Sequence, residues 1–171
     1  MDCVLEDLTK SLQSAVEGLS DEQFSWHPAA NKWSVGEILE HLYLSYTGTT
    51  KGFEKMLASG KPMFASRTLS NRVRSLVVFG FNYLPSGRES PQSTRPKGLP
   101  LEKVRLDLPG KIVAMDAIIS KAEVQFGRGA PILQHPFLGP LTGAQWRKFH
   151  RLHGQHHRKQ IMQLRANMPA K

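Results

Sequence analysis

Four of the chain's seven histidines fall within one short stretch, FHRLHGQHHRKQ at residues 149–160. They are His150, His153, His156 and His157. Imidazole nitrogens are common ligands of divalent metal ions, and two histidines four positions apart on a helix lie about 6 Å apart along its axis, close enough to share one ion. His153 and His157 have this spacing. The stretch therefore indicates either a metal site or a basic surface that faces solvent or nucleic acid.

A heptad-like periodicity favours an inward position for three of these histidines. If the last segment is helical, one seam with steps of 4, 3, 4, 3 and 4 runs through Trp146, His150, His153, His157, Gln160 and Leu164. Inward imidazoles need partners, because burying an unsatisfied polar group is unfavourable. By spacing, His150 could replace either His153 or His157 as a ligand. His156 is predicted to be peripheral, and Gln160 could orient an imidazole. A third ligand has to come from another segment.

Two capping boxes predict where the long helices that carry these residues begin. Ser34 and Glu37 form one box, and Thr142 and Gln145 form the other. In each box the first side chain accepts from the backbone amide of the fourth residue, whose own side chain reaches back to the first amide. The helix that starts at the first box is predicted to end near Gly60, and the helix that starts at the second box is predicted to run to about residue 168.

Three side chains near these helix starts are candidates for the surroundings of the site. Trp33 can pack on Ile38, and Leu141 on Trp146, as hydrophobic staples. Both tryptophans lie within about two helical turns of a proposed ligand and could also wall a pocket. His41 lies on the flank of its helix's apolar stripe. From the residues alone, His41 is either an exposed histidine or the third ligand.

Helical periodicity also predicts helices over residues 2–18, 67–81 and 109–126, the last with Pro109 near its start. Residues 101–108 are ambiguous. The helices together predict an all-α fold, an antiparallel four-helix bundle. With 171 residues, 40% of them hydrophobic, the whole chain is expected to form a single domain.

Two segments are expected to be loops. Residues 83–100, YLPSGRESPQSTRPKGLP, are rich in Pro, Ser and Gly and predict a long irregular surface loop in the middle of the chain, with little reason to pack. Residues 127–141 are predicted to be a second loop.

Composition excludes several classes of protein. No run of about 18 apolar residues predicts a transmembrane helix. The start of the chain has the pattern of an amphipathic helix and not that of a signal peptide, so a cytoplasmic location is expected. The one cysteine, Cys3, rules out an intrachain disulfide. No GxSxG elbow, phosphate-binding loop or CxxC pair is present.

The net charge of +9 is expected either to attract an anionic partner or to serve solubility alone. Basic residues are spread along the chain without forming a stripe, so no nucleic-acid partner is expected. The candidates to hold an anionic substrate are Arg67, Arg72, Arg147 and Arg151.

Three ordered motifs carry a resemblance to a known family. They are KWSVGEILEHL, which contains His41, HPFLGPLTGAQW before the last helix, and HGQHHRKQI, which contains His153 and His157. In this order they resemble the DinB/YfiT superfamily of small metal-binding helical bundles. The resemblance implies a four-helix bundle of the DinB/YfiT type and a divalent metal bound by His41, His153 and His157. Residues 61–108 carry little of this resemblance.

The resemblance also implies an activity. A metal held by three histidines keeps an open position and can activate water or a thiol. Family members act as thiol S-transferases with low-molecular-weight thiols, or are suggested to be hydrolases. Zinc or nickel is the expected metal, although three imidazoles also accept iron or copper. The alternative is a non-catalytic, metal-stabilised scaffold. A homodimer through helix faces is implied, and the apolar residues 76–81 could form either that face or core.

Overall fold

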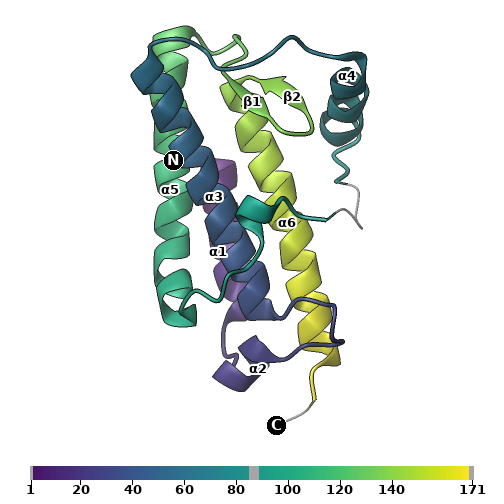
Figure 1. Ribbon diagram of the computed structural model, residues 1–171. Helices are drawn as coiled ribbons and strands as arrows, with labels where there is room; N and C mark the ends of the chain where they lie inside the picture. Colours follow the sequence, from purple (N-terminus) through teal and green to yellow (C-terminus); the bar gives the residue numbers. More distant parts are fainter. Residues whose placement is uncertain (1, 85–88, 170–171) are drawn as a thin grey trace.

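Four long helices form a bundle in the computed structural model, which describes residues 2–84 and 89–169 (Figure 1). They are α1 (Cys3–Val16), α3 (Val35–Ser59), α5 (Leu101–Phe126) and α6 (Gly143–Asn167). The predicted all-α four-helix bundle is therefore confirmed. A short helix, α2 (Asp21–Ser25), lies between α1 and α3.

The bundle consists of two parallel pairs of helices that run antiparallel to each other. Arg165, near the end of α6, donates to the carbonyl of Ala15, near the end of α1, at 2.7 Å. The first turns of α3 and α5 likewise lie side by side (Figure 1). By contrast, Phe53 near the end of α3 contacts Trp146 near the start of α6, with ring centroids 5.8 Å apart. Because α3 and α5 are parallel, the chain between them has to return along the length of the bundle.

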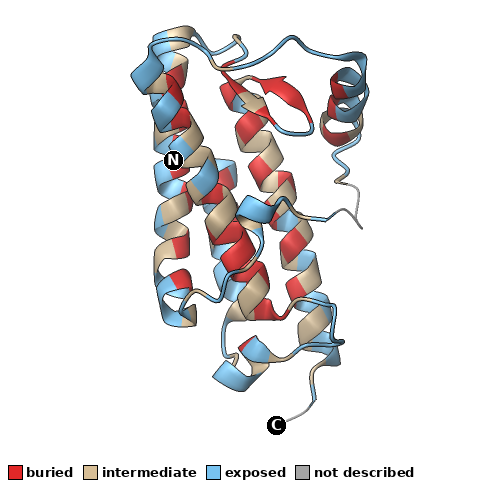
Figure 2. Cartoon of the chain, viewed as in Figure 1, coloured by how far each residue is buried: buried red, intermediate tan, exposed pale blue. Residues whose placement is uncertain are grey.

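The core lies between the four long helices, whose buried positions face one another in Figure 2. On α1 the buried residues are Leu5, Leu8, Leu12 and Ala15, at the helical spacing that the sequence predicts. Both predicted capping boxes are present with their reciprocal hydrogen bonds, at Ser34 with Glu37 and at Thr142 with Gln145. The boxes fix the first turns of α3 and α6.

The start predicted for α5 is wrong. The helix begins at Leu101, after Pro100, and Pro109 lies in its interior. Val104 and Leu108 are buried in the core, as are Ile112 and Met115 after the proline, so packing keeps the first two turns helical. Pro109 removes one amide donor and leaves the carbonyl of the residue four positions earlier without its helical partner.

A β-hairpin forms where a loop was predicted, over part of residues 127–141. Strands β1 (Leu133–His135) and β2 (Gly139–Leu141) pair antiparallel. The buried His135 shapes the turn, because its Nδ1 accepts the backbone amides of Phe137 and Leu138, both at 3.2 Å. An acceptor role requires a neutral ring, and burial lowers the pKa of His135 to about 4.

The third predicted helix is present as α4 (Leu69–Ser75) followed by one π-helical segment, η1 (Leu76–Gly80). α4 stands apart from the bundle, beside the hairpin (Figure 1). Ser75 donates to the carbonyl of Leu138 at 3.0 Å, and Lys148 of α6 donates to that of Phe79 at 2.7 Å. Within the apolar stretch 76–81, Val78 is buried, whereas Phe81 is 75% exposed. A dimer contact there stays a prediction.

The expectation that residues 83–100 have little reason to pack is wrong. Residues 89–100, called the strap here, cross α3 and contain a short 3₁₀ helix, η2 (Gln92–Thr94) (Figure 1). The buried carboxylate of Glu40 accepts the backbone amides of Lys97 at 2.6 Å and Gly98 at 3.1 Å. The sequence signals of a loop are correct, but a buried acid on α3 attaches it. The part of this predicted loop at residues 85–88 lies outside the described residues.

An ion network joins α5 to α6. Arg147 donates to Asp116 at 2.5 Å, to both carboxylate oxygens of Glu123 at 2.9 Å, and to Ser120 at 2.8 Å. Asp116 also accepts the backbone amide of Asp2 at 2.7 Å. Arg147 is therefore committed to the bundle, and its prediction as an anion-holding residue is wrong.

Replacing Arg147 by Met is expected to lower the free energy of unfolding by about 3–5 kcal/mol, because Asp116 and Glu123 would remain buried without a counter-charge. Urea denaturation measures the change. Arg151→Met, one turn further along the same helix, is the matched control and should change the free energy by about 0.5 kcal/mol or less. Equal effects of the two substitutions would contradict this role of Arg147.

Stability should fall as the pH drops below about 6.5, the ordinary histidine pKa of the unfolded chain. Because the pKa of His135 is about 4 in the folded protein, the unfolded chain binds more protons between these values. His135→Asn should reduce the slope of unfolding free energy against pH by up to about 1.4 kcal/mol per pH unit in that window. Above pH 7 the slopes should coincide; an unchanged slope near pH 5 would contradict the assignment.

Candidate metal centre

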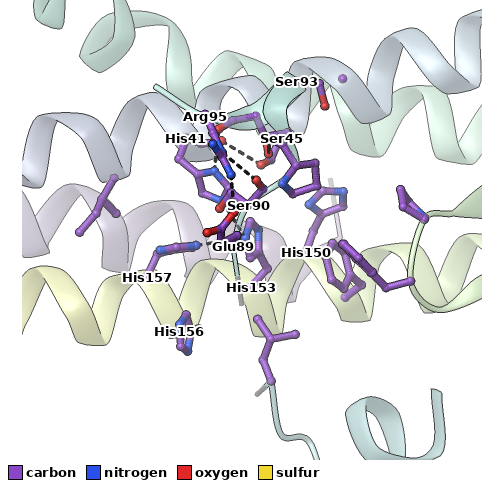
Figure 3. A pocket seen from close by; sticks show the side chains of 18 of the residues that line it. His41, Ser45, Glu89, Ser90, Ser93, Arg95, His150, His153, His156 and His157 are labelled. Atoms are coloured by element: carbon purple, nitrogen blue, oxygen red, sulfur yellow. Dashed lines mark hydrogen bonds and ion pairs between the residues drawn. The ribbon is translucent and has the colours of Figure 1, made fainter. Parts of the chain in front are cut away.

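Three histidines from two helices meet at one point between α3 and α6. The Nε2 atom of His153 lies 3.0 Å from that of His41 and 3.1 Å from that of His157. One nitrogen from each ring lies within 4.8 Å of the other two. The side chains point toward one another from the facing helices (Figure 3). The structure therefore brings together the three residues that the sequence resemblance implied as ligands.

Hydrogen bonds fix the tautomers of two of the three rings. The Nδ1 of His41 lies 2.8 Å from the carbonyl oxygen of Thr94, and that of His157 lies 2.8 Å from Oε1 of Gln160. A carbonyl oxygen can only accept, so each Nδ1 carries the proton. Each Nε2 then holds a lone pair directed at the meeting point. Oxygen acceptors at the far ring nitrogen are the usual support of histidines that bind metals.

The third ring, that of His153, has a different environment. Its Nδ1 is buried and has no hydrogen-bond partner among the described residues. The ring stacks on Phe149, with centroids 5.5 Å apart and planes inclined by 12°. Packing, and not a hydrogen bond, thus holds its orientation. With the proton on Nδ1, His153 adds a third lone pair to the meeting point, and this donor set fits a divalent cation.

Burial keeps the cluster neutral. Desolvation lowers the pKa of His153 well below its usual range, that of His157 to about 3, and that of His41 in the same direction. The neighbouring imidazoles add to the effect at His153 and His157, because charging one ring disfavours charging the next. Neutral imidazole is the form that binds metal, so the lone pairs are available at neutral pH.

The other two histidines of the stretch take different places. His156 is only partly buried, and its Nε2 accepts from the amide nitrogen of Gln160 at 3.2 Å. Gln160 therefore bridges His156 and His157, which is the orienting contact predicted for it. His150 is 1% exposed, and its Nε2 contacts the hydroxyl of Thr49 at 2.9 Å. It lies outside the three-histidine cluster.

The cluster lies on the wall of a large cavity of ≈ 1940 Å³. Trp33 lines this cavity and contacts His41, with ring centroids 5.1 Å apart. Trp146 also lines it, so both predicted wall residues do so. Residues of the strap, including Glu89 and Arg95, extend across the same space (Figure 3).

The remaining predicted anion-binding residues do not gather at the cavity. Arg67 donates to the carbonyl of Pro140 at 2.6 Å, and neither Arg72 nor Arg151 belongs to the lining. The basic residues that do line the cavity are Lys32, Lys51, Arg74 and Arg95. Sequence reasoning also missed Thr94 and Glu40, the support of His41. The one signal in the sequence is the acidic residue Glu40 directly before the proposed ligand His41.

Comparisons with known proteins identify the family of the chain and a solved structure of similar fold. The chain matches the family described as "Protein of unknown function (DUF1569)" over residues 2–164. The chain belongs to this family. YuaE of Bacillus subtilis (strain 168), described as uncharacterized, is 26% identical over 166 residues, covering 90% of each protein.

The fold has a solved counterpart. YfiT from Bacillus subtilis, described as "a probable metal-dependent hydrolase with an unusual four-helix bundle topology", matches with a TM-score of 0.61 and 21% identity. The match covers 97% of this chain and 84% of YfiT. At this identity the likeness shows the fold, and it confirms the predicted bundle of the DinB/YfiT type. Within the described residues, no helix is both long and apolar enough to cross a bilayer.

Replacing Glu40 by Gln should loosen the support of His41. A carboxamide has one acceptor oxygen for the two strap amides, and its NH₂ group would face a backbone donor. We expect the free energy of unfolding to fall by about 1–3 kcal/mol and the share of His41 protonated at Nδ1 to decrease. Long-range ¹⁵N–¹H NMR of the imidazoles reads the tautomer.

Glu54→Gln is the matched control, because it makes the same charge change at an exposed position on the same helix. It should leave both the stability and the His41 tautomer unchanged. If His41 keeps its Nδ1 proton equally well in the Glu40→Gln protein, then the strap does not orient this ring.

Proposed function

We propose that this protein is a metal-dependent enzyme that holds one divalent ion through His41, His153 and His157 and hydrolyses a small-molecule substrate. One observation carries the proposal: three neutral imidazoles direct their Nε2 atoms to one point on the wall of a large cavity. A ligand set at a cavity wall leaves one side for substrate, which is the arrangement of catalytic rather than structural metal sites.

The residues around the ligands have separate tasks in this proposal. Thr94 and Gln160 keep the protons of His41 and His157 on Nδ1, so that Nε2 stays free. Phe149 stacks on the face of His153, and Trp33 packs at a tilt against the ring of His41, so both aromatic rings help to hold the ligands in place. When bound, a divalent ion with three neutral ligands keeps its full charge, lowers the pKa of a water or thiol that it holds, and polarises a substrate carbonyl.

Zinc or nickel is the metal we propose. Both accept three imidazole nitrogens and an open position, and neither needs the carboxylate that completes many non-haem iron sites. Among the described residues, no Cys, Asp or Glu joins the three histidines in the group of potential ligands. Iron and copper also bind imidazole, so metal supply contributes to the choice.

Hydrolysis is the preferred reaction because the solved structure with this fold is described as a probable metal-dependent hydrolase. Transfer of a low-molecular-weight thiol is a second candidate. It is supported by the cations that line the cavity, since such thiols usually carry carboxylates. A non-catalytic scaffold receives less support, because a structural metal is normally enclosed by four protein ligands.

Metal content tests the proposal directly. Protein purified without an affinity tag or added metal should contain about one divalent ion per chain by inductively coupled plasma mass spectrometry. His153→Ala should lose most of it, because His153 is the central member of the cluster. His27→Ala, at an exposed histidine outside the cluster, is the control and should keep the metal.

Circular dichroism of the three proteins separates loss of metal from loss of fold. Wild-type protein that binds neither zinc nor nickel, even when these are supplied, would rule the proposal out. Activity assays with ester, amide and thiol-acceptor substrates follow on the metal-loaded protein.

A further inference from the structure

A glycine lies in the middle of α3, on the face that carries a proposed metal ligand. Gly48 follows His41 by seven residues, which is about two helical turns. The two residues therefore lie on the same face of α3, about 10 Å apart along its axis. Both residues line the large cavity. Glycine at this position therefore decides how much space the cavity has beside the cluster.

Neither the helix nor the packing requires glycine at this position. Gly48 does not have a positive φ, and a Cβ atom added to it would meet nothing within 4 Å. Glycine is the poorest helix former apart from proline, because it loses the most backbone freedom on folding. Almost any other residue would stabilise α3. The absence of a side chain is thus unexplained by structure and coincides with the edge of a cavity.

Small residues continue along the same face of α3. Ser45, Gly48, Thr49 and Gly52 all line the cavity after His41. A Cβ atom on Gly52 would lie 3.2 Å from the Leu133 side chain, so the hairpin closes the far end tightly. These small side chains leave a shallow channel, called the trough here, that runs along α3 for about 16 Å from the cluster toward the hairpin.

The walls of this trough are apolar, and its far end is positive. Phe149 of α6, Phe137 of the hairpin and Val77 of η1 line it. Lys51 and Arg74 also belong to the lining, and neither forms an ion pair with an acid in the portions of the chain that the structure describes.

The acids that line the cavity have other partners. Glu37 accepts the amide of Ser34 and pairs with His27, and Glu89 pairs with Arg95. Among the described residues that line the cavity, no acid is therefore left to neutralise Lys51 and Arg74, and the trough has a net attraction for an anion.

We propose that Gly48 keeps open a specificity subsite for an elongated apolar group of the substrate, with an anionic end that lies toward Lys51 and Arg74. The placing of the reactive end at the three histidines rests on the proposed function. The subsite itself does not, because its shape and charge come from residues outside the cluster. A cavity larger than the roughly 300–1,000 Å³ of a typical small-molecule site agrees with a substrate that extends beyond its reacting group.

Gly48→Leu tests the subsite, with Gly110→Leu as matched control. Gly110 is also exposed in the interior of a long helix with nothing within 4 Å of an added Cβ, but it does not line the cavity. Both substitutions should raise the unfolding midpoint by about 2–4 °C, because leucine is the better helix former. A loss of binding in Gly48→Leu cannot then be attributed to misfolding.

The probe is 8-anilinonaphthalene-1-sulfonate, an aromatic anion, in a fluorescence titration. Wild type and Gly110→Leu should bind it saturably with the same Kd, and Gly48→Leu should raise the Kd about tenfold or more. Dodecanoate should displace the probe at lower concentration than dodecylamine does, because the subsite attracts an anion. Zinc binding by all three proteins should be equal, since Gly48 does not contact the histidines.

Three results would overturn the proposal: no saturable binding by wild type, an unchanged Kd in Gly48→Leu, or displacement by dodecylamine as effective as by dodecanoate. Failure of the proposed function is a separate result, because it would appear as absent metal binding by wild type. Probe binding that depends on Gly48 in a protein without metal would keep the subsite and remove the metal chemistry.

Discussion

The hydrogen bonds that Glu40 accepts from the strap position the backbone carbonyl that supports His41, the one ligand of the candidate centre that does not lie on α6. Glu40 precedes His41 on α3, and its buried carboxylate fixes the strap by two backbone amides. The fixed strap presents the carbonyl of Thr94 to His41, 53 residues away in sequence. That contact sets the tautomer of one ring, and the direction of its lone pair follows. A largely irregular surface segment, with one short 3₁₀ helix, is thus connected through one buried acid to a ring of the cluster.

Local signals explain what the sequence could predict. The two capping boxes need only four consecutive residues each, and the spacing of His153 and His157 follows from helix geometry alone. The start of α5 was misjudged because a proline interrupts the local signal while burial of Val104 and Leu108 maintains the helix. His41 could be assigned only through a resemblance, since its own helix leaves it at the edge of the apolar stripe.

Contacts between distant segments explain what the sequence could not predict. The strap and the hairpin have little hydrophobic periodicity, so contacts with other segments order them. Glu40 accepts two backbone amides of the strap, and the ring nitrogen of Trp146 donates to the carbonyl of Leu133 in the hairpin at 3.2 Å. Arg147 has the charge expected of an anion site, yet two acids on α5 occupy it. The sequence shows that a residue is charged, but only the fold shows whether neighbouring residues already pair with that charge or leave it able to bind a ligand.

The antiparallel arrangement of the two helix pairs has a consequence for folding. His41 belongs to one pair and His153 to the other, and 112 residues separate them. An ion shared by these two rings would close a loop of that length, and closure of a loop of about 100 residues removes chain entropy worth several kcal/mol from the unfolded state. The metal would then act as a reversible cross-link. This cross-link could form only after the last helix had been synthesised, because His153 lies on that helix. The folded population would then rise with the free concentration of the ion.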